Sequence, residues 1–205
     1  MNLPNKLTVA RICIIPVFMV FLLVPFSFGG NGDTVCRWIA AVFFLAAAIT
    51  DHLDGRIARK YNLVTDFGKF LDPLADKMMV LGAMIGLIVL SGRAAFSTED
   101  NVYFCLTATL TFIVLFRELA VTSLRLAASG AKGVVIAANY LGKTKTVVQI
   151  IFVLAALLEP PIFGWCAVGQ HHIISYFFML FTAVMTVWSG LSYFKGYFPV
   201  INSNK

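Results

Sequence analysis

Four aspartates in a mostly apolar sequence are the residues best suited to do chemistry. Asp51 and Asp54 stand three positions apart. Asp72 and Asp76 stand four positions apart, and each pair borders an apolar run long enough to cross a bilayer. Ionisable side chains in such places are costly and usually have a functional partner. On helices each pair shares one face, so two facing helices could bring all four carboxylates together. Such hard oxygen ligands select Mg²⁺, Mn²⁺ or Ca²⁺ rather than zinc.

Cationic residues elsewhere in the chain could form a second site, for anions. Four of them are predicted to lie at the same membrane surface as the aspartates: Arg117, Arg125, Lys143 and Lys145. Two divalent ions about 4 Å apart would hold a pyrophosphate during an in-line displacement, and the cations could hold the phosphate of an acceptor. Glu118 beside Arg117 indicates a fixed network, whereas the alternative is that the arginines only reach the headgroups. The combination favours phosphoryl transfer from a lipid to a phosphorylated acceptor.

The composition indicates which elements position these residues. Of 205 residues, 60% are hydrophobic and 13% are charged, and the mean hydropathy is +0.86. Soluble domains have about a quarter charged residues, so we expect an all-α integral membrane protein instead. The connections between the apolar blocks are too short for a further domain, which predicts one membrane domain over residues 1–205.

Six apolar blocks are long enough to span the bilayer as helices. We expect them at about residues 8–28, 34–49, 68–90, 102–126, 142–159 and 173–194. The second is expected to continue as a helix through Arg59, and residues 91–101 are expected to form a polar loop. If the blocks alternate in direction, 14 of the 16 lysines and arginines fall on one side, and Arg37 and Arg93 on the other. The positive-inside rule then predicts that both termini and the aspartates face the cytoplasm.

The N-terminal residues carry a polar stripe on an apolar background. Asn5, Thr8 and Arg11 recur every three residues, which predicts a short interfacial helix before the first span. From this helix Arg11 could extend to the lipid headgroups. Alternatively, the stripe could face the headgroup of a bound lipid.

Two small residues share nearly the same helix face as the first pair of aspartates. Gly55 and Ala58 carry no bulky side chain, so they would leave a trough in which a wide group can approach the helix backbone. The alternative is that they pack closely against another helix.

The far side of the membrane is expected to carry little chemistry. Glu99 and Asp100 are predicted to be surface residues. His171 and His172 are expected to lie away from every carboxylate, which argues against a metal site there. Tyr193 is predicted to belong to a belt of interfacial aromatic residues near the other surface.

The aspartate spacing resembles a known family. The signature of the CDP-alcohol phosphotransferases is matched at all eight positions by Asp51-x2-Asp54-Gly55-x2-Ala58-Arg59-x8-Gly68-x3-Asp72-x3-Asp76. Eight fixed residues at fixed spacing make a specific pattern. Within this family, the bacterial phosphatidylglycerophosphate synthase branch is resembled by the segments NLPNKLTVARICIIPVF, FRELAVTSLR and GKTKT.

The resemblance implies an activity and a setting. It implies transfer of the phosphatidyl group of CDP-diacylglycerol to sn-glycerol 3-phosphate, with release of CMP and dependence on two divalent cations, Mg²⁺ or Mn²⁺. It also implies six transmembrane helices, commonly a homodimer, in a bacterial cell membrane with the active site facing the cytoplasm. We expect no nucleic-acid partner.

Residue roles follow from the same resemblance. Asp51, Asp54 and Asp72 would ligate the two ions, while Asp76 would ligate one ion and act as the base for the acceptor hydroxyl. Residues expected to hold the CDP-lipid are Gly55, Ala58, Arg59, Gly68, Asn5 and Thr8. Residues expected at the acceptor phosphate are Arg11, Arg117, Glu118, Arg125, Lys143 and Lys145.

Two other functions remain open on the sequence. A sister enzyme could use inositol phosphate, serine or a second phosphatidylglycerol as acceptor, and charge alone cannot separate inositol phosphate from glycerol phosphate. An ion-coupled transporter would place its acids across the membrane depth and show duplicated halves. Here the acids are predicted at one surface, and no internal repeat is visible.

Overall fold

Long apolar runs become helices because backbone groups in lipid must pair within their own segment. The computed structural model describes the backbone of residues 3–24, 26, 32–60, 66–94, 98–132 and 140–202, and most of the side chains in these ranges. The described residues form seven helices and no strand. These helices are α1 (Leu3–Leu23), α2 (Gly32–Lys60), α3 (Asp66–Ala94), α4 (Thr98–Lys132), α5 (Tyr140–Phe163), α6 (Ala167–Gln170) and α7 (Ile173–Asn202).

All helices except the four-residue α6 are long and apolar enough to cross a membrane. The six candidate spans are Asn5–Leu23, Gly32–Asp51, Leu71–Arg93, Asp100–Leu126, Leu141–Phe163 and Ile173–Gly196. The predicted all-α class and the predicted number of spans are therefore confirmed.

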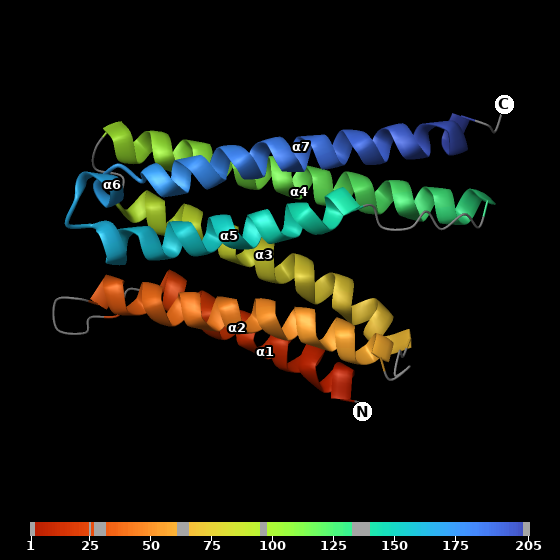
Figure 1. The fold of residues 1–205 in the computed structure, drawn as a ribbon, viewed down its shortest axis with the longest axis horizontal. Coiled ribbons are helices and arrows are strands. Elements are labelled where there is room, and N and C mark those ends of the chain that lie inside the picture. Colours follow the sequence, from red (N-terminus) through yellow and green to blue (C-terminus); the bar gives the residue numbers. More distant parts are fainter. Residues whose placement is uncertain are drawn as a thin grey trace.

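The helices lie side by side, with α3 and α5 in the middle of the bundle (Figure 1). The pair α1 and α2 lies on one side of them, and the pair α4 and α7 lies on the other; α3 contacts α1 and α4, and α5 contacts α2 and α7. The two marked chain ends lie at the same end of the bundle. We call this the signature end, because Asp51 near the end of α2 and Asp72 near the start of α3 lie toward it. The other is the opposite end.

Large side chains fill the space between the helices. Phe18 of α1 and Phe44 of α2 meet edge to face at 5.8 Å between ring centroids, and both are fully buried. Met79 of α3 and Phe152 of α5 are buried in the same core. This core joins α1 and α2 to α3 and α5, so it stabilises the relative placement of α2 and α3, which carry the aspartates.

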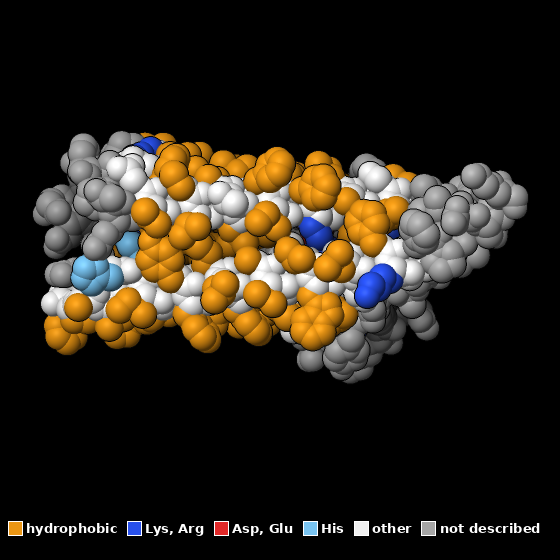
Figure 2. Space-filling view, turned by 90° about the horizontal axis from the view of Figure 1, so that it is seen from above, with side chains coloured by type: hydrophobic (Ala, Val, Ile, Leu, Met, Phe, Trp, Pro, Cys, Tyr) orange, Lys and Arg blue, Asp and Glu red, His pale blue; other side chains and the backbone are white. Residues whose placement is uncertain are grey.

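The outward faces of the bundle are apolar. Hydrophobic side chains cover most of the face drawn in Figure 2, and none of the described side chains visible on it is acidic. Phe112 and Leu180 expose 67% of their surface, and Leu126 exposes 70%. An apolar surface of this extent is unusual in water and suits contact with lipid tails.

Several helix boundaries differ from the expected ones. The polar loop expected at residues 91–101 is wrong for most of its length, because α3 continues to Ala94 and α4 begins at Thr98. The last turn of α3 is polar but helical because its side chains find partners: Ser91 donates to the carbonyl of Leu87 at 2.9 Å. The polar N-terminal stripe and the first span form one continuous helix, α1, which ends at Leu23 rather than near residue 28.

One buried and one exposed contact secure the opposite end of the bundle. Glu159 of α5 is 2% exposed and accepts hydrogen bonds from the backbone N–H groups of Ile174 and Ser175, each at 2.7 Å, and from the Ser175 hydroxyl. It thereby satisfies the first free N–H groups of α7, as a capping side chain would. Arg93 of α3 donates to the carbonyl of Leu23 at the end of α1, where a cation complements the helix dipole.

Candidate active site

The N-terminal half of α1 contacts two of the signature carboxylates, which lie on α2 and α3. Arg11 is fully buried, and its Nη1 lies 2.6 Å from Oδ1 of Asp51 on α2. Thr8, one turn earlier, donates its hydroxyl proton to Oδ1 of Asp72 on α3 at 2.7 Å. The interpretation that Arg11 extends to the headgroups is therefore wrong. The polar stripe points inward because it meets carboxylates on two neighbouring helices.

These contacts bear on the roles expected for the stripe. Asn5 and Thr8 are both buried, with 7% and 1% exposure. Their expected place at the CDP-lipid, and that of Arg11 at the acceptor phosphate, stay predictions. Both predictions are compatible with a substrate bound directly over the carboxylates of Asp51 and Asp72.

Asp76 lies deeper in the bundle, one helical turn beyond Asp72 on α3. Its Oδ1 atom is buried and makes no hydrogen bond within the described part of the chain. The charges of Asp51, Glu118 and Lys145 are close enough to act on it. A buried carboxylate oxygen without a partner is rare in native proteins and needs an explanation, and binding of a cation or a substrate hydroxyl would provide one.

A charged network links α4, α5 and α7 next to Asp76. Glu118 accepts a hydrogen bond from Nη1 of Arg117 at 2.8 Å and also pairs with the ammonium group of Lys145. Arg117 further donates from Nη2 to the hydroxyl of Ser189 on α7 at 2.5 Å. The fixed network expected around Glu118 is confirmed. Glu118 contacts both cations, and its expected place at the acceptor phosphate stays a prediction.

The remaining predicted cations differ in how they are held. Arg125 donates from Nη2 to the hydroxyl of Tyr193 at 2.9 Å, and its guanidinium lies 5.1 Å from the centre of that ring. Tyr193 is only 4% exposed, so its assignment to the interfacial belt is wrong; it faces inward to support Arg125. Lys143 is exposed at the start of α5. It lies two residues before the buried Lys145 on the same helix.

Part of the signature falls outside the described side chains. Asp54, Gly55, Ala58 and Arg59 lie on α2, whose backbone is helical there as expected. Their expected contacts stay predictions. Gly68 is buried near the start of α3.

The roles of three residues near the site were not predicted from the sequence. Ser189 and Tyr193 lie one turn apart on α7 and face the arginines of α4. Gln149 lies one turn after Lys145 on α5 and is 1% exposed. A polar residue four positions after a functional lysine shares its helix face, and that spacing would have been the signal for Gln149.

Comparison with known proteins adds to this geometry. A family model described as CDP-alcohol phosphatidyltransferase matches residues 1–188. The chain belongs to the CDP-alcohol phosphatidyltransferase family. The match covers all six candidate spans apart from the end of the last.

Several members of the CDP-alcohol phosphatidyltransferase family are similar over most of this chain. A CDP-diacylglycerol–glycerol-3-phosphate 3-phosphatidyltransferase of Bacillus subtilis is 47% identical over 163 residues, which is 77% of each chain. A probable phosphatidylglycerophosphate synthase of Mycobacterium tuberculosis is 35% identical over 192 residues, 94% of this chain and 79% of the other. A Pseudomonas fluorescens protein with the same name as the first is 31% identical, with 100% and 94% covered.

The carboxylates fit the divalent metal expected for a CDP-alcohol phosphatidyltransferase. Asp51 and Asp76 bring negative charge to one place, and Oδ1 of Asp76 is buried without a hydrogen-bond partner among the described residues. Carboxylate oxygens are the donors that Mg²⁺ and Mn²⁺ prefer. The side chains described do not include Asp54, and no three of them form a ready metal cluster. The expected four-carboxylate site therefore stays a prediction.

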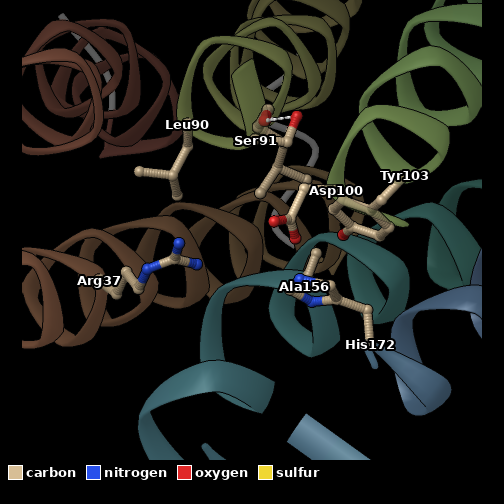
Figure 3. A pocket seen from close by; sticks show the side chains of 8 residues that line it. Arg37, Leu90, Ser91, Asp100, Tyr103, Ala156 and His172 are labelled. Atoms are coloured by element: carbon tan, nitrogen blue, oxygen red, sulfur yellow. Dashed lines mark hydrogen bonds between the residues drawn. The ribbon is translucent and has the colours of Figure 1, made fainter. Parts of the chain in front are cut away.

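A second polar cavity lies at the opposite end of the bundle. Figure 3 shows Arg37, Asp100, Tyr103 and His172 gathered around one space between the helices. The cavity has a volume of about 20 Å³, close to the room that one water needs. Asp100 lines it together with His172, so the expectation that the histidines lie away from every carboxylate is wrong. Asp100 is half-buried rather than on the open surface.

His172 is held in an unusual way beside this cavity. Its backbone φ is 51°, in the left-handed region, and its ring stacks on Tyr103 with 4.3 Å between centroids. Burial lowers the pKa of His172, and the nearby Arg37 lowers it further, against the raising effect of Glu159 and Asp100. The neutral imidazole is thus the form that the folded protein favours.

Proposed function

We propose that the protein transfers the phosphatidyl group of CDP-diacylglycerol to sn-glycerol 3-phosphate and releases CMP. The observation that carries this proposal is the convergence at the signature end: signature aspartates on α2 and α3 face a buried cationic network on α4 and α5. One part suits a metal-bound pyrophosphate and the other suits the phosphate of an acceptor. The names of the similar proteins support the same reaction.

The chain's own residues supply positioning and proton transfer. The acyl chains of the donor stay in lipid beside the apolar faces, while its diphosphate lies over Asp51 and Asp72, which α1 orients through Arg11 and Thr8. Lys145 and Arg117 hold the acceptor phosphate in the orientation that Glu118 gives them. Divalent cations, held by Asp51, Asp54, Asp72 and Asp76, would supply charge stabilisation for the pyrophosphate.

The chemical step balances with Asp76 as the base. Asp76 accepts the proton of the C1 hydroxyl of glycerol 3-phosphate, and that oxygen bonds to the phosphorus that carries the diacylglycerol. The bond from this phosphorus to the oxygen of the CMP phosphate breaks, and CMP leaves with the electron pair. Burial of Asp76 keeps bulk water away from the reacting phosphorus, which suppresses hydrolysis.

Exchanging the proposed base tests this mechanism. Asp76→Asn keeps the shape of the side chain but cannot accept the proton, so turnover should fall by at least about 100-fold. Binding of CDP-diacylglycerol to the purified variant should remain measurable. Full activity in Asp76→Asn would remove Asp76 from the base role.

An acceptor panel tests the substrate assignment. Purified protein with Mg²⁺ or Mn²⁺ and CDP-diacylglycerol should release CMP with glycerol 3-phosphate, and not with inositol phosphate, serine or phosphatidylglycerol. The buried cations favour a phosphorylated acceptor, because Glu118 offsets only one of the two positive charges of Arg117 and Lys145 and a neutral acceptor would leave the other without a counter-charge. No CMP with glycerol 3-phosphate would overturn the acceptor, and no CMP with any acceptor would overturn the reaction class.

We further infer the setting of the enzyme. It is a homodimer of multi-pass subunits in the bacterial cell membrane, with the signature end and both termini in the cytoplasm and the start of α1 at the interface. The excess of lysine and arginine at that end supports the orientation. A C-terminal reporter that works only in the cytoplasm should be active, and native mass spectrometry of the purified protein should give twice the chain mass.

A further inference from the structure

A buried amide next to the active site has no role in the mechanism above. Gln149 of α5 is 1% exposed, and its Nε2 atom makes no hydrogen bond within the described part of the chain. Buried amide groups are nearly always paired, because loss of hydration without a new hydrogen bond is unfavourable. The unpaired Nε2 of Gln149 is therefore available to donate a hydrogen bond to a ligand.

Gln149 lines a very small cavity together with the proposed base. The cavity has a volume of about 10 Å³ and lies between α3, α4 and α5, which is about the room for one oxygen atom. Its polar wall includes Asp76, Gln149 and the Glu118–Lys145 pair. Its apolar wall is formed by Val80, Leu81 and Val114.

The two unpaired atoms in this cavity have opposite hydrogen-bonding character. Oδ1 of Asp76 can only accept when the carboxyl group is ionised, and Nε2 of Gln149 can only donate. A hydroxyl group can donate to the first and accept from the second. The apolar wall suits the carbon that carries such a hydroxyl, so the cavity fits a C–OH group.

We propose that this cavity binds the C2 hydroxyl of the acceptor and that Gln149 is the residue that recognises it. The inference rests on the proposed function. The C1 and C2 hydroxyls of glycerol 3-phosphate are on adjacent carbons, so placing the first at Asp76 brings the second within reach of the residues around it. Gln149 therefore selects acceptors that carry a hydroxyl next to the nucleophile, while Lys145 and Arg117 select the phosphate.

Two acceptors and one substitution test the proposal. The acceptors are glycerol 3-phosphate and 3-hydroxypropyl phosphate, which differ only in the C2 hydroxyl. Gln149→Met keeps the length of the side chain but removes the amide. It should lower kcat/KM for glycerol 3-phosphate by about tenfold, the effect of one lost buried hydrogen bond. For 3-hydroxypropyl phosphate, kcat/KM should change by no more than about twofold.

A matched variant on the same cavity wall separates recognition from general disturbance. Thr146 also lines the cavity, but its hydroxyl donates within its own helix to the carbonyl of Gly142 at 3.3 Å. Thr146→Val should affect both acceptors by the same factor. Gln149→Asn, which retains a shorter amide, should show a smaller loss than Gln149→Met, again only with glycerol 3-phosphate.

Three results would overturn the inference. Wild-type protein that uses both acceptors equally well would show that the C2 hydroxyl is not recognised, whatever the variants do. Equal losses for both acceptors in Gln149→Met would assign Gln149 to support of the fold, and no loss for either would remove it from the site. Failure of the proposed function looks different, because wild-type protein would then release no CMP with glycerol 3-phosphate.

Discussion

Neutralising Glu118 should destabilise the protein strongly, because it holds two buried cations. Its side chain is 13% exposed, and those of Arg117 and Lys145 are 10% and 6% exposed. Glu118→Gln keeps the shape and one hydrogen-bond acceptor but removes the negative charge. Breaking a buried ion pair by removing one partner costs about 3–5 kcal/mol. Since Gln can still accept from Arg117, we expect the lower value, about 3 kcal/mol.

Thermal unfolding of the purified protein in detergent measures this effect. For a chain of this size, 3 kcal/mol corresponds to a Tm that is lower by about 10 °C. The control is the double variant Glu118→Gln with Lys145→Met, which removes one of the two cations together with the charge that paired it. It should recover at least half of the loss, because the remaining Arg117 keeps its hydrogen bond to Ser189.

Two results would refute this reasoning. A Tm for Glu118→Gln within about 2 °C of wild type would mean that the cations are well solvated despite their low exposure. A double variant that is less stable than Glu118→Gln would mean that Lys145 stabilises the fold through contacts other than Glu118.

Two further predictions concern the two ends of the bundle. Thr8→Val removes the hydrogen bond to Asp72, so the Mg²⁺ or Mn²⁺ concentration for half-maximal activity should rise by about tenfold. Thr8→Ser keeps the hydroxyl and should have the metal dependence of the wild type. An unchanged metal dependence in Thr8→Val would contradict an orienting role of Thr8. Burial lowers the pKa of His172 below its usual 6.5, so below pH 6.5 the unfolded chain binds more protons at this residue than the folded protein does. The free energy of unfolding should therefore be unaffected by His172 above pH 6.5 and should decrease as the pH drops below that value. His172→Asn, which tolerates the left-handed φ of 51°, should flatten the dependence of Tm on pH between about 8 and 5; an unchanged slope would assign it to other groups.

The spans could be predicted because hydrophobicity over about 20 residues is a property of the chain alone. The helix boundaries in polar segments could not be predicted in this way, because they depend on the hydrogen-bond partners that each polar side chain meets in the folded chain. Ser91 continues α3 since its hydroxyl finds a carbonyl one turn back. Glu159 lies within α5, rather than marking its end, because it caps α7.

The carboxylates of the site could be identified from their spacing, but their neighbours could not. The stripe of α1 had two open interpretations, and only tertiary contact shows that Arg11 and Thr8 face Asp51 and Asp72. Tyr193 resembles an interfacial aromatic residue in its position, yet it turns inward because Arg125 offers its hydroxyl a donor. Helical spacing gives the face of a residue, while the neighbouring helix decides what that face meets.

The pairing of Arg11 with Asp51 also has a consequence for how the chain enters the membrane. Arg11 belongs to the first helix and Asp51 to the second, so during synthesis the cation is in place before the carboxylate arrives. Pairing with Arg11 during insertion would lower the energy of placing the acidic residue of the second helix in lipid. Asp72 follows on the third helix, where it contacts Thr8. The first helix would thus serve as an internal template on which the acidic site is assembled, one helix at a time.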